Sequence, residues 1–578
     1  MPRKSTQFSK LLRDRFGIES LRAGQQEVID SVLAGHDTLA IMPTGAGKSL
    51  CYQLPALHLG GTTVVASPLI SLMKDQADKL DEVGVDATQV NSTLTSRDES
   101  TAIADIKQSK HDVVFATPER LADPEFIAAL RKNDIKLFVI DEAHCISQWG
   151  HDFRPAFLEV AGAVAAVGKP PVLALTATAT DAVIDDIRRQ LGSPRMRVIN
   201  TGIYRENLHY AVRQVTNAQE KHTSLLSFVK NNSGSGIVYT ATVKATEEVY
   251  GWLSEAGESV TRYHGRLSAS ERMHNQDAFM RGDVRVMVAT NAFGMGIDKP
   301  DIRFILHYQF PATLEAYYQE SGRAGRDGKT AACTLLYDRT DRRIQQFFLV
   351  RRYPVAGDIS AVHEALRTAG ASQGSVTIDD VKAHATLTAS TKQLIALKLL
   401  KDAGVVAQDR KHRYRLTRTD SSDADFERLA EEYKNKTAQD HDKLERMVFY
   451  AQSAFCRWRV LLEYFGEDAK PERCGHCDNC VSPPAVVAEL KPVVTDSPGE
   501  TLRRAKFAAG QCVDVRRFGE GRVVTAAADK ITIVFPDGNT RTFLPEFVKA
   551  CKARRAAQAQ PEDGDTASAE PKASRRAA

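Results

Sequence analysis

The chain has 578 residues, a length typical of three to five domains, with 43% hydrophobic and 26% charged residues. Its formal net charge of only +4 excludes a uniformly basic protein, so any basic surface must be local. No apolar run is long enough to cross a membrane, no secretion signal is evident, and nine cysteines in this length do not suggest a disulfide scaffold. We therefore expect a cytoplasmic protein without a membrane partner.

Short runs of Val, Ile and Leu alternate with helical stretches in the first part of the chain. This alternation predicts an α/β protein with two tandem parallel-sheet lobes, over residues 9–200 and 201–340. The strands expected in the first lobe are residues 38–42, 63–67, 113–117, 137–140 and 172–176. Those expected in the second lobe are residues 236–239, 259–263, 284–289, 304–308 and 332–336.

Smaller segments follow the two lobes. Three short helices (359–368, 378–385, 391–403) and a basic hairpin predict a winged-helix-like domain over residues 356–418. The remaining predictions are a helical cysteine-containing module over 419–482, a linker over 483–504, a small β-barrel over 505–550 and a disordered tail over 551–578.

A glycine-rich turn, Pro-Thr-Gly-Ala-Gly-Lys-Ser at residues 43–49, follows the first predicted strand. Backbone N–H groups of such a turn cradle the phosphates of ATP, while its lysine reaches the terminal phosphates. The expected ATP-binding residues here are Thr44, Gly45, Ala46, Gly47, Lys48 and Ser49. The alternative is an accidental glycine-rich turn.

An acidic pair, Asp141 and Glu142, follows a later apolar run. Ser49 and Asp141 can share a Mg²⁺ ion, and Glu142 then stands where a base for the attacking water is needed. Because the turn and the pair supply complementary halves of one ATP-hydrolysis site, we expect Lys48, Asp141 and Glu142 to be catalytic.

The second lobe carries two arginines about one helical turn apart, Arg323 and Arg326. Arginine donates to phosphate oxygens in a fork, which suits the charge that spreads over a transferred phosphoryl group. If the two lobes clamp ATP, both side chains reach the nucleotide from across the cleft. The alternative is a solvated basic helix start.

Cysteines crowd together near residue 477. Cys474, Cys477 and Cys480 have the C-x₂-C-x₂-C spacing that lets three thiolates converge on one ion. His476 is an alternative ligand, and an iron–sulfur cluster is an alternative to zinc. The other cysteines outside this region are interpreted as ordinary thiols: Cys51, Cys145, Cys333, Cys512 and Cys551.

Residues 11 to about 337 resemble the core of superfamily 2 helicases, with RecA-like lobes, and specifically the RecQ family. The matching segments are residues 21–25, 43–49, 67–76, 117–120, 141–144, 175–179, 289–299 and 319–328. The most family-specific run, residues 145–154, is the aromatic-rich loop that in RecQ proteins couples single-stranded DNA to ATP hydrolysis.

The resemblance implies further roles in the nucleotide site. Gln25 reads the adenine edge beside Arg22, and His144 relays between the acidic pair and Gln319. Ile18 stands where the family usually has an aromatic side chain that stacks on adenine.

The resemblance also implies DNA contacts. In the aromatic-rich loop, the rings of Trp149 and Phe153 suit stacking on the bases of single-stranded DNA, and Arg154 supplies a positive charge. The alternative is that the two aromatic side chains belong to the core. The DNA-binding residues expected in the helicase core are Ser67, Lys74, Gln148, Trp149, Phe153, Arg154 and Thr290. At the tip of the predicted wing, Arg410, Lys411 and His412 suit duplex phosphates, with a solvated charged face as the alternative.

The family zinc module adds Cys456 to the three clustered cysteines and so implies a closed Cys₄ zinc site. Unlike in the best-known RecQ proteins, the winged-helix segment precedes these cysteines. The terminal barrel resembles the Tudor-like module of UvrD and PcrA helicases. That resemblance implies a docking surface for a protein such as RNA polymerase, or for nucleic acid.

Together these features predict a bacterial ATP-dependent DNA helicase of the RecQ type that uses Mg²⁺ and Zn²⁺. It would move 3′ to 5′, unwind forked, overhanging or branched DNA in recombination and repair, and associate with the nucleoid. The alternatives are an RNA helicase of the same superfamily and a non-enzymatic adaptor that binds DNA or RNA polymerase.

Overall fold

The computed structural model of the protein divides into two compact units, Met1–Leu490 and Lys491–Ala578, and each is described by itself. The residues described are 11–147, 154–294, 297–385, 390–409, 413–468, 472–483, 507–508, 510–515, 519–526, 531–535, 540–543 and 548–551. Predictions for residues 148–153, for the wing tip at 410–412, and for most of the linker and tail lie outside these ranges.

The first lobe is a seven-stranded parallel sheet with the order β3-β4-β2-β5-β6-β1-β7. Its strands are β1 Thr38–Ile41, β2 Thr62–Ala66, β3 Ala87–Val90, β4 Val113–Ala116, β5 Ile135–Ile140, β6 Val172–Thr176 and β7 Arg197–Asn200. Its α-helices are α2 Gln25–Leu33, α3 Leu50–Leu59, α4 Ile70–Glu82, α5 Ser96–Lys107, α6 Pro124–Leu130, α7 Val160–Ala166 and α8 Asp181–Gln190.

Successive side chains of the central strands enter two separate cores. In β4, Val114 packs in one cluster while Val113 and Phe115 pack in the other, on the opposite face. A parallel sheet covered by helices on both faces needs apolar residues at every position, which explains the continuous apolar runs. All five strands predicted for this lobe are confirmed within two residues. The edge strands β3 and β7 were not predicted.

The second lobe is a six-stranded parallel sheet with the order β10-β11-β9-β12-β13-β8. Its strands are β8 Leu208–Gln214, β9 Ser235–Tyr239, β10 Val260–Tyr263, β11 Val286–Ala289, β12 Ile302–His307 and β13 Ala331–Tyr337. Its helices are α9 Ala218–Asn231, α10 Val243–Glu255, α11 Ala269–Arg281 and α12 Leu314–Ser321. The five predicted strands are again confirmed, and β8 is an addition.

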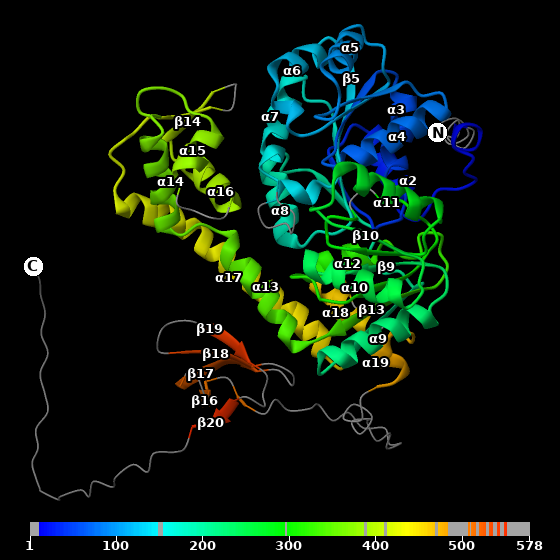
Figure 1. The fold of residues 1–578 in the computed structure, drawn as a ribbon, viewed down its shortest axis with the longest axis vertical. Helices are drawn as coiled ribbons and strands as arrows, with labels where there is room; N and C mark the ends of the chain where they lie inside the picture. The colour runs from blue at the N-terminus through cyan, green and yellow to red at the C-terminus, as the bar shows by residue number, and fades with distance from the viewer. Residues whose placement is uncertain are drawn as a thin grey trace, which may run out of the picture. The chain divides into compact units, whose positions relative to one another are not determined.

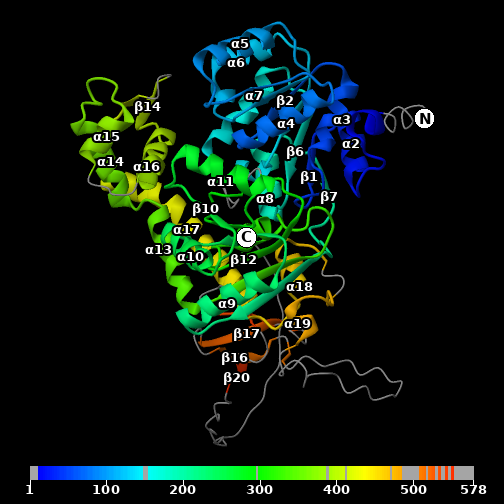
Figure 2. The same cartoon turned by 45° about the vertical axis from the view of Figure 1, so that its right-hand side comes forward.

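A helical pair follows the second lobe and encloses the winged-helix-like segment. Helices α13 (Arg342–Arg352) and α17 (Asp423–Gln452) run side by side in both views (Figures 1 and 2). Tyr353 donates to Asp440 at 2.8 Å, which fixes their pairing. The elements between them are α14 Ala356–Thr368, α15 Ile378–His384, α16 Ser390–Asp402, β14 Val406–Gln408 and β15 Tyr414–Leu416. The winged-helix-like segment is therefore an insertion in this pair, and its hydrophobic core also includes Phe426, Leu429 and Ala430 of α17.

The zinc module packs onto the edge strand of the second lobe. Trp458, on α18 (Arg457–Tyr464), is buried in the core of that lobe and donates from Nε1 to the carbonyl of Leu208 at 3.2 Å. Asp478, at the start of α19 (Asp478–Val481), accepts from the backbone N–H of Val212 at 2.8 Å. The module and β8 therefore share one core.

The second unit contains a five-stranded antiparallel sheet with the order β19-β18-β17-β16-β20. Its strands are β16 Cys512–Val515, β17 Gly519–Ala526, β18 Ile531–Val534, β19 Thr540–Phe543 and β20 Val548–Ala550. Cys512 and Cys551 form a disulfide with their Cα atoms 5.6 Å apart, so the interpretation of these two residues as ordinary thiols was wrong. The antiparallel register of β16 and β20 brings the two cysteines together.

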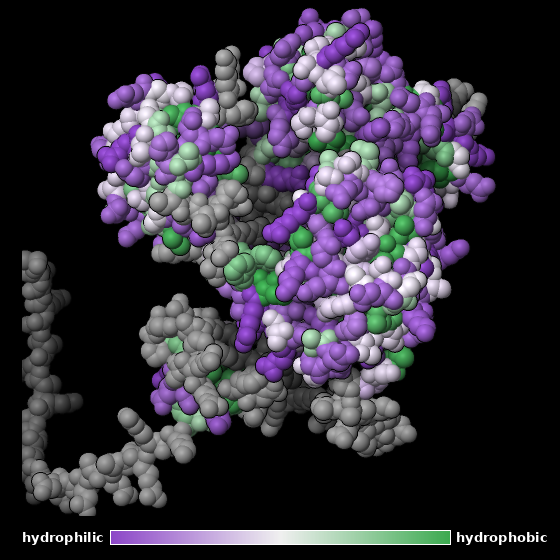
Figure 3. All heavy atoms as spheres, in the orientation of Figure 1, coloured by the Kyte–Doolittle hydropathy of each residue, from purple (hydrophilic) through white to green (hydrophobic). Residues whose placement is uncertain are grey.

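Surface polarity agrees with the composition. On the face seen in Figure 3, hydrophilic side chains cover most of the described surface of the two lobes, and hydrophobic ones are scattered. Among the described helices, none is both long and apolar enough to span a membrane.

Candidate nucleotide and zinc sites

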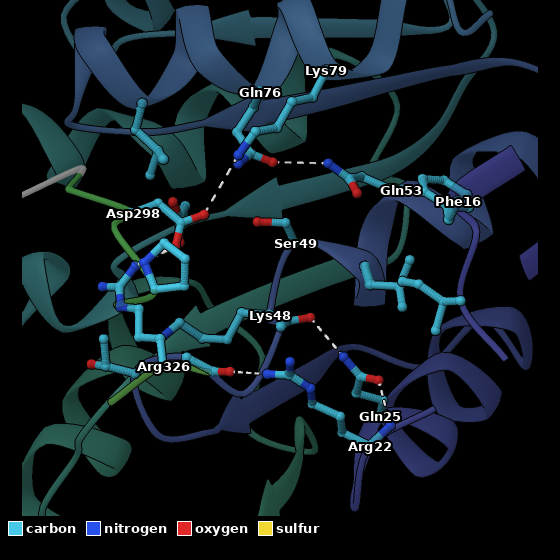
Figure 4. A pocket seen from close by; sticks show the side chains of 18 of the residues that line it. Phe16, Arg22, Gln25, Lys48, Ser49, Gln53, Gln76, Lys79, Asp298 and Arg326 are labelled. Atoms are coloured by element: carbon cyan, nitrogen blue, oxygen red, sulfur yellow. Dashed lines mark hydrogen bonds and ion pairs between the residues drawn. The ribbon is translucent and has the colours of Figure 1, made fainter. Parts of the chain in front are cut away.

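A cleft with a volume of about 610 Å³ lies between the two lobes of the first unit. One wall is the glycine-rich turn between β1 and α3, which projects Lys48 and Ser49 into the cleft (Figure 4). Asp141 and Glu142, which follow β5, form its floor. Both segments lie at the carboxyl ends of parallel strands, where α/β proteins bind their ligands.

The turn requires glycine at two positions. Gly45 and Gly47 have φ angles of 85° and 78°, in the left-handed region that side chains disfavour. A Cβ atom on Gly47 would lie 2.6 Å from Nε2 of Gln25, so the glycine also permits a close approach. Gln25 donates to the carbonyls of Ala46 and Gly47, at 3.0 and 2.9 Å, and accepts from the backbone of Arg22 at 2.7 Å. In this conformation Gln25 braces the turn.

The acidic pair is partly buried, and its two carboxylates repel each other. Desolvation and the neighbouring Glu142 carboxylate raise the pKa of Asp141 to about 7. His144 Nδ1 lies 3.3 Å from the Glu142 carboxylate and 3.1 Å from the hydroxyl of Thr176. Two adjacent, partly buried carboxylates that line the same cleft as a lysine and a serine hydroxyl fit a divalent cation, which would relieve their repulsion.

The opposite wall comes from the second lobe. Gln319, Arg323 and Arg326 line the cleft, and Arg326 forms an ion pair with Asp298 at 2.7 Å. Asp298 in turn lies 3.5 Å from Lys79 of the first lobe, so a chain of charges crosses the cleft (Figure 4). Arg323 is buried and donates to the carbonyl of Gly294.

Both arginines retain unused donor capacity. Among the described residues, Nε of Arg323 and Nε of Arg326 are buried without a hydrogen-bond partner. Buried donors of this kind are costly unless a ligand satisfies them, and phosphate oxygens are suitable acceptors. The residues present therefore fit a nucleotide triphosphate with its Mg²⁺.

Several residues that line the cleft were not predicted from the sequence, among them Phe16, Lys79 and Asp298. Phe16 lines the cleft (Figure 4), as does Ile18, and it offers the aromatic face that Ile18 lacks. Its position two residues before Ile18 was the available signal. Lys79 and Asp298 lie 219 positions apart in the chain, and neither stands out by type or spacing.

The four cysteines of the zinc module converge on one point. The Sγ atoms of Cys456, Cys474, Cys477 and Cys480 all lie within 4.8 Å of one another. The Cys456–Cys477 and Cys474–Cys480 sulfur pairs are each 3.9 Å apart. A Zn–S bond of about 2.3 Å in a tetrahedron places sulfur atoms about 3.8 Å apart, so this set fits zinc. His476 stacks on His209 instead, with ring centroids 4.7 Å apart.

Two of the predicted DNA-binding residues of the core lie directly after a strand, one in each lobe. Ser67 follows β2 and Thr290 follows β11, each at the carboxyl end of a strand, and Lys74 is exposed on α4. Arg154 donates to the carbonyl of Pro68 at 3.2 Å and so ties the end of the aromatic-rich loop to the segment after β2. Gln148, Trp149 and Phe153, like Arg410, Lys411 and His412, lie outside the described residues.

Family models match three parts of the chain: DEAD/DEAH box helicase over residues 22–187, the helicase conserved C-terminal domain over 220–328, and RecQ zinc-binding over 407–481. The chain is 38% identical over 473 residues to the ATP-dependent DNA helicase RecQ of Bacillus subtilis, covering 81% of this chain and 66% of that protein. It is 35% identical over 480 residues to the probable ATP-dependent DNA helicase RecS of the same organism, covering 82% of this chain and 92% of that protein.

The chain belongs to the RecQ family of ATP-dependent DNA helicases. It spans somewhat less than two thirds of the RecQ of Pasteurella multocida, at 63% of that protein and 35% identity. Among solved structures, Mycobacterium smegmatis helicase Lhr bound to ssDNA and AMP-PNP shares its fold, with a TM-score of 0.50 and 20% identity, covering 71% of this chain and 60% of that one. DUF1998 helicase MrfA bound to DNA is similar to the same degree, with a TM-score of 0.50 and 18% identity, covering 73% and 64%.

Proposed function

We propose that this RecQ protein is an ATP-dependent DNA helicase that moves 3′ to 5′ along one strand and separates forked, overhanging or branched DNA in recombination and repair. One observation carries the proposal. Lys48 and the Asp141–Glu142 pair of the first lobe face Arg323 and Arg326 of the second lobe across a single cleft. An ATP site divided between two lobes can convert hydrolysis into relative motion of the lobes.

The residues of the cleft suit different roles in ATP binding and hydrolysis. The N–H groups of residues 44–49 and the Lys48 ammonium would bind the phosphates, and Ser49 with Asp141 would hold Mg²⁺, which neutralises phosphate charge. Glu142 would orient the attacking water and take its proton, with its carboxylate oriented by His144. Arg323 and Arg326 would stabilise the charge on the transferred phosphoryl group, and Gln319 would connect them to His144.

Binding of DNA is proposed at the carboxyl ends of the strands, through Ser67, Lys74, Arg154 and Thr290. Contacts there with the phosphate backbone carry affinity without sequence preference. The aromatic-rich loop and the wing tip are proposed as additional contacts. The proposed domain organisation is two lobes, an inserted winged-helix-like domain, a zinc module and a terminal barrel.

Strand displacement tests the function directly. On duplexes with a 3′ tail, a 5′ tail or a fork, we expect ATP-dependent displacement of DNA from the 3′-tailed and forked substrates. The Glu142→Gln variant should bind the same DNA without displacing strands. Displacement that occurs only on RNA duplexes would favour the RNA helicase alternative, and equal rates for the variant and the natural protein would reject the proposed base.

The terminal sheet is proposed to dock a partner, either RNA polymerase or nucleic acid, with the protein located in the cytoplasm at the nucleoid. Val524 on β17 is 46% exposed and offers an apolar contact on the surface of this sheet. We expect Val524→Asp to weaken co-purification with RNA polymerase core enzyme and to leave ATP hydrolysis unchanged. An unaltered yield of polymerase would reject this docking surface.

A further inference from the structure

Arg205 lies in the segment that joins the last strand of the first lobe to the first strand of the second. Its guanidinium group donates to four backbone carbonyl oxygens. From Nη1 it reaches Thr44 at 3.3 Å and Gly322 at 2.7 Å. From Nη2 it reaches Ala324 at 2.8 Å and Gly325 at 2.6 Å.

Three of these carbonyls belong to one turn, which begins directly after α12 and carries both Arg323 and Arg326. Carbonyl oxygens of a tight turn repel one another when they point inward, unless a donor group satisfies them. A guanidinium fork can satisfy several acceptors in one plane, whereas a lysine ammonium cannot reproduce that geometry. Arg205 therefore determines the shape of the turn.

Asn207 completes the support of this turn. Its Nδ2 donates to the carbonyls of Gly325 and Lys329, at 2.8 Å each. Gly325 has a φ angle of 57°, and a Cβ atom there would lie 2.5 Å from Asn207 Nδ2. The backbone of this turn thus packs closely around the side chains of Arg205 and Asn207. This packing restricts the directions in which the two arginines of the turn can point.

The fourth carbonyl, that of Thr44, belongs to the phosphate-binding turn of the first lobe. The two turns approach closely at this point, because a Cβ atom on Gly322 would lie 3.3 Å from Cβ of Thr44. Arg205 also lines a hollow of about 340 Å³ behind the phosphate-binding turn, together with Arg22 and Arg326. One side chain thus connects the loop that would hold the phosphates to the turn that would stabilise the transition state.

We propose that Arg205 is a positioning residue for ATP hydrolysis, which aims Arg323 and Arg326 at the nucleotide and couples their turn to the phosphate-binding turn. This inference rests on the proposed ATPase function of the cleft. Arg205 acts through backbone carbonyls. Its contribution belongs to the transition state, where the two arginines act, more than to the binding of ATP.

The test compares Arg205→Lys with Arg213→Lys in the full-length protein. Arg213 is an exposed arginine on β8 and serves as the matched control. We expect Arg205→Lys to lower kcat of DNA-stimulated ATP hydrolysis about 10²-fold, the effect of misplacing a catalytic group by about 1 Å. KM for ATP should change less than about threefold, because the donors of the phosphate-binding turn remain. Arg213→Lys should leave both constants unchanged.

A double-mutant cycle separates positioning from a structural defect. If Arg205 acts through Arg326, adding Arg205→Lys to Arg326→Ala should cost far less than Arg205→Lys costs alone. Normal kcat for Arg205→Lys, or losses that multiply independently in the double variant, would overturn the inference. If Arg205→Lys also lowers the zinc content and the melting temperature, the loss of kcat reflects misfolding, and the inference would be overturned in favour of a folding role. Absence of ATPase activity in the natural protein would instead reject the proposed function.

Discussion

The zinc site and the nucleotide site are built in opposite ways. The four zinc ligands come from a segment of 25 residues, and their sulfur atoms already lie within 4.8 Å of one another. The nucleotide site draws on two lobes and on residues about 300 positions apart. Its cationic side chains are held by internal partners, since Arg326 is paired with Asp298 and Arg323 with the carbonyl of Gly294.

This difference indicates that the zinc site has a fixed structural role, whereas the nucleotide site can change conformation. The zinc site, whose ligands already lie together, gains stability from its ion, and it cannot change conformation without losing that ion. A site whose arginines are bound to internal partners must exchange those partners for phosphate oxygens when ATP binds. That exchange of partners can change the position of one lobe relative to the other. Four substitutions, ordered by expected effect, test this contrast.

The largest effect should come from the zinc site. Replacing Cys477 with Ser removes one thiolate from a site whose ion contributes about 10 kcal/mol in small zinc peptides. We expect the purified variant to contain less than about half of the natural zinc and to lose the cooperative melting of the module. Metal analysis and thermal unfolding would measure both. Cys333→Ala, a buried free thiol in β13, is the control, and it should retain full zinc content.

A smaller but still severe effect is expected from Glu142→Gln. Loss of a general base costs about 10²–10⁴-fold in rate, so kcat for ATP hydrolysis should fall by that factor. The affinity for ATP should persist or increase, because the neutral amide no longer repels the phosphates or Asp141. Single-turnover hydrolysis and binding of a fluorescent ATP analogue would test the two parts separately. A parallel loss of affinity would show that Glu142 shapes the site.

Phe16→Ala should have a moderate effect. An aromatic face that lines the cleft contributes about 1 kcal/mol to stacking on a base, so KM for ATP should rise about fivefold at constant kcat. Ile18→Ala, at the neighbouring lining position, is the control and should change KM less. Equal effects of the two substitutions would mean that Phe16 contributes only apolar area.

The smallest effect is expected from Asp298→Asn. Arg326 and Lys79 hold the pKa of this carboxyl below its usual value even though burial works in the opposite direction. Because ATP must displace Asp298 from Arg326, removal of the charge should tighten ATP binding about threefold, in keeping with about 0.7 kcal/mol for a partly exposed ion pair. Asp283→Asn, which removes an exposed pair with Arg281, is the control. Weaker binding of ATP by Asp298→Asn would mean that Asp298 orients Arg326 productively.

Sequence reasoning succeeded where few residue types can do the task. Nine of the ten predicted strands lie in the interior of a sheet, where apolar side chains are favoured on both faces. The strands that were not predicted, β3 (Ala87–Val90), β7 (Arg197–Asn200) and β8, all lie at sheet edges, and β3 and β7 carry polar residues. The phosphate-binding turn needs glycine and lysine at fixed places, and the thiolates need a fixed spacing.

The remaining features depend on contacts that only the fold creates. Arg205 is defined by carbonyl groups from residues more than 100 positions away, and the carbonyl oxygen has no side-chain signature. The Cys512–Cys551 disulfide joins residues 39 positions apart through the register of two antiparallel strands. In both cases the relevant pattern is spatial.

The docking of the zinc module on β8 has a consequence for how the protein would fail. β8 is an edge strand, paired on one side only with β13, and Asp478 and Trp458 occupy backbone groups on it. Asp478 lies between two zinc ligands, Cys477 and Cys480. Loss of the metal would therefore uncover a strand edge that can pair with another copy of the chain. In zinc-starved cells, the zinc-free protein should therefore form insoluble aggregates rather than remain an inactive monomer.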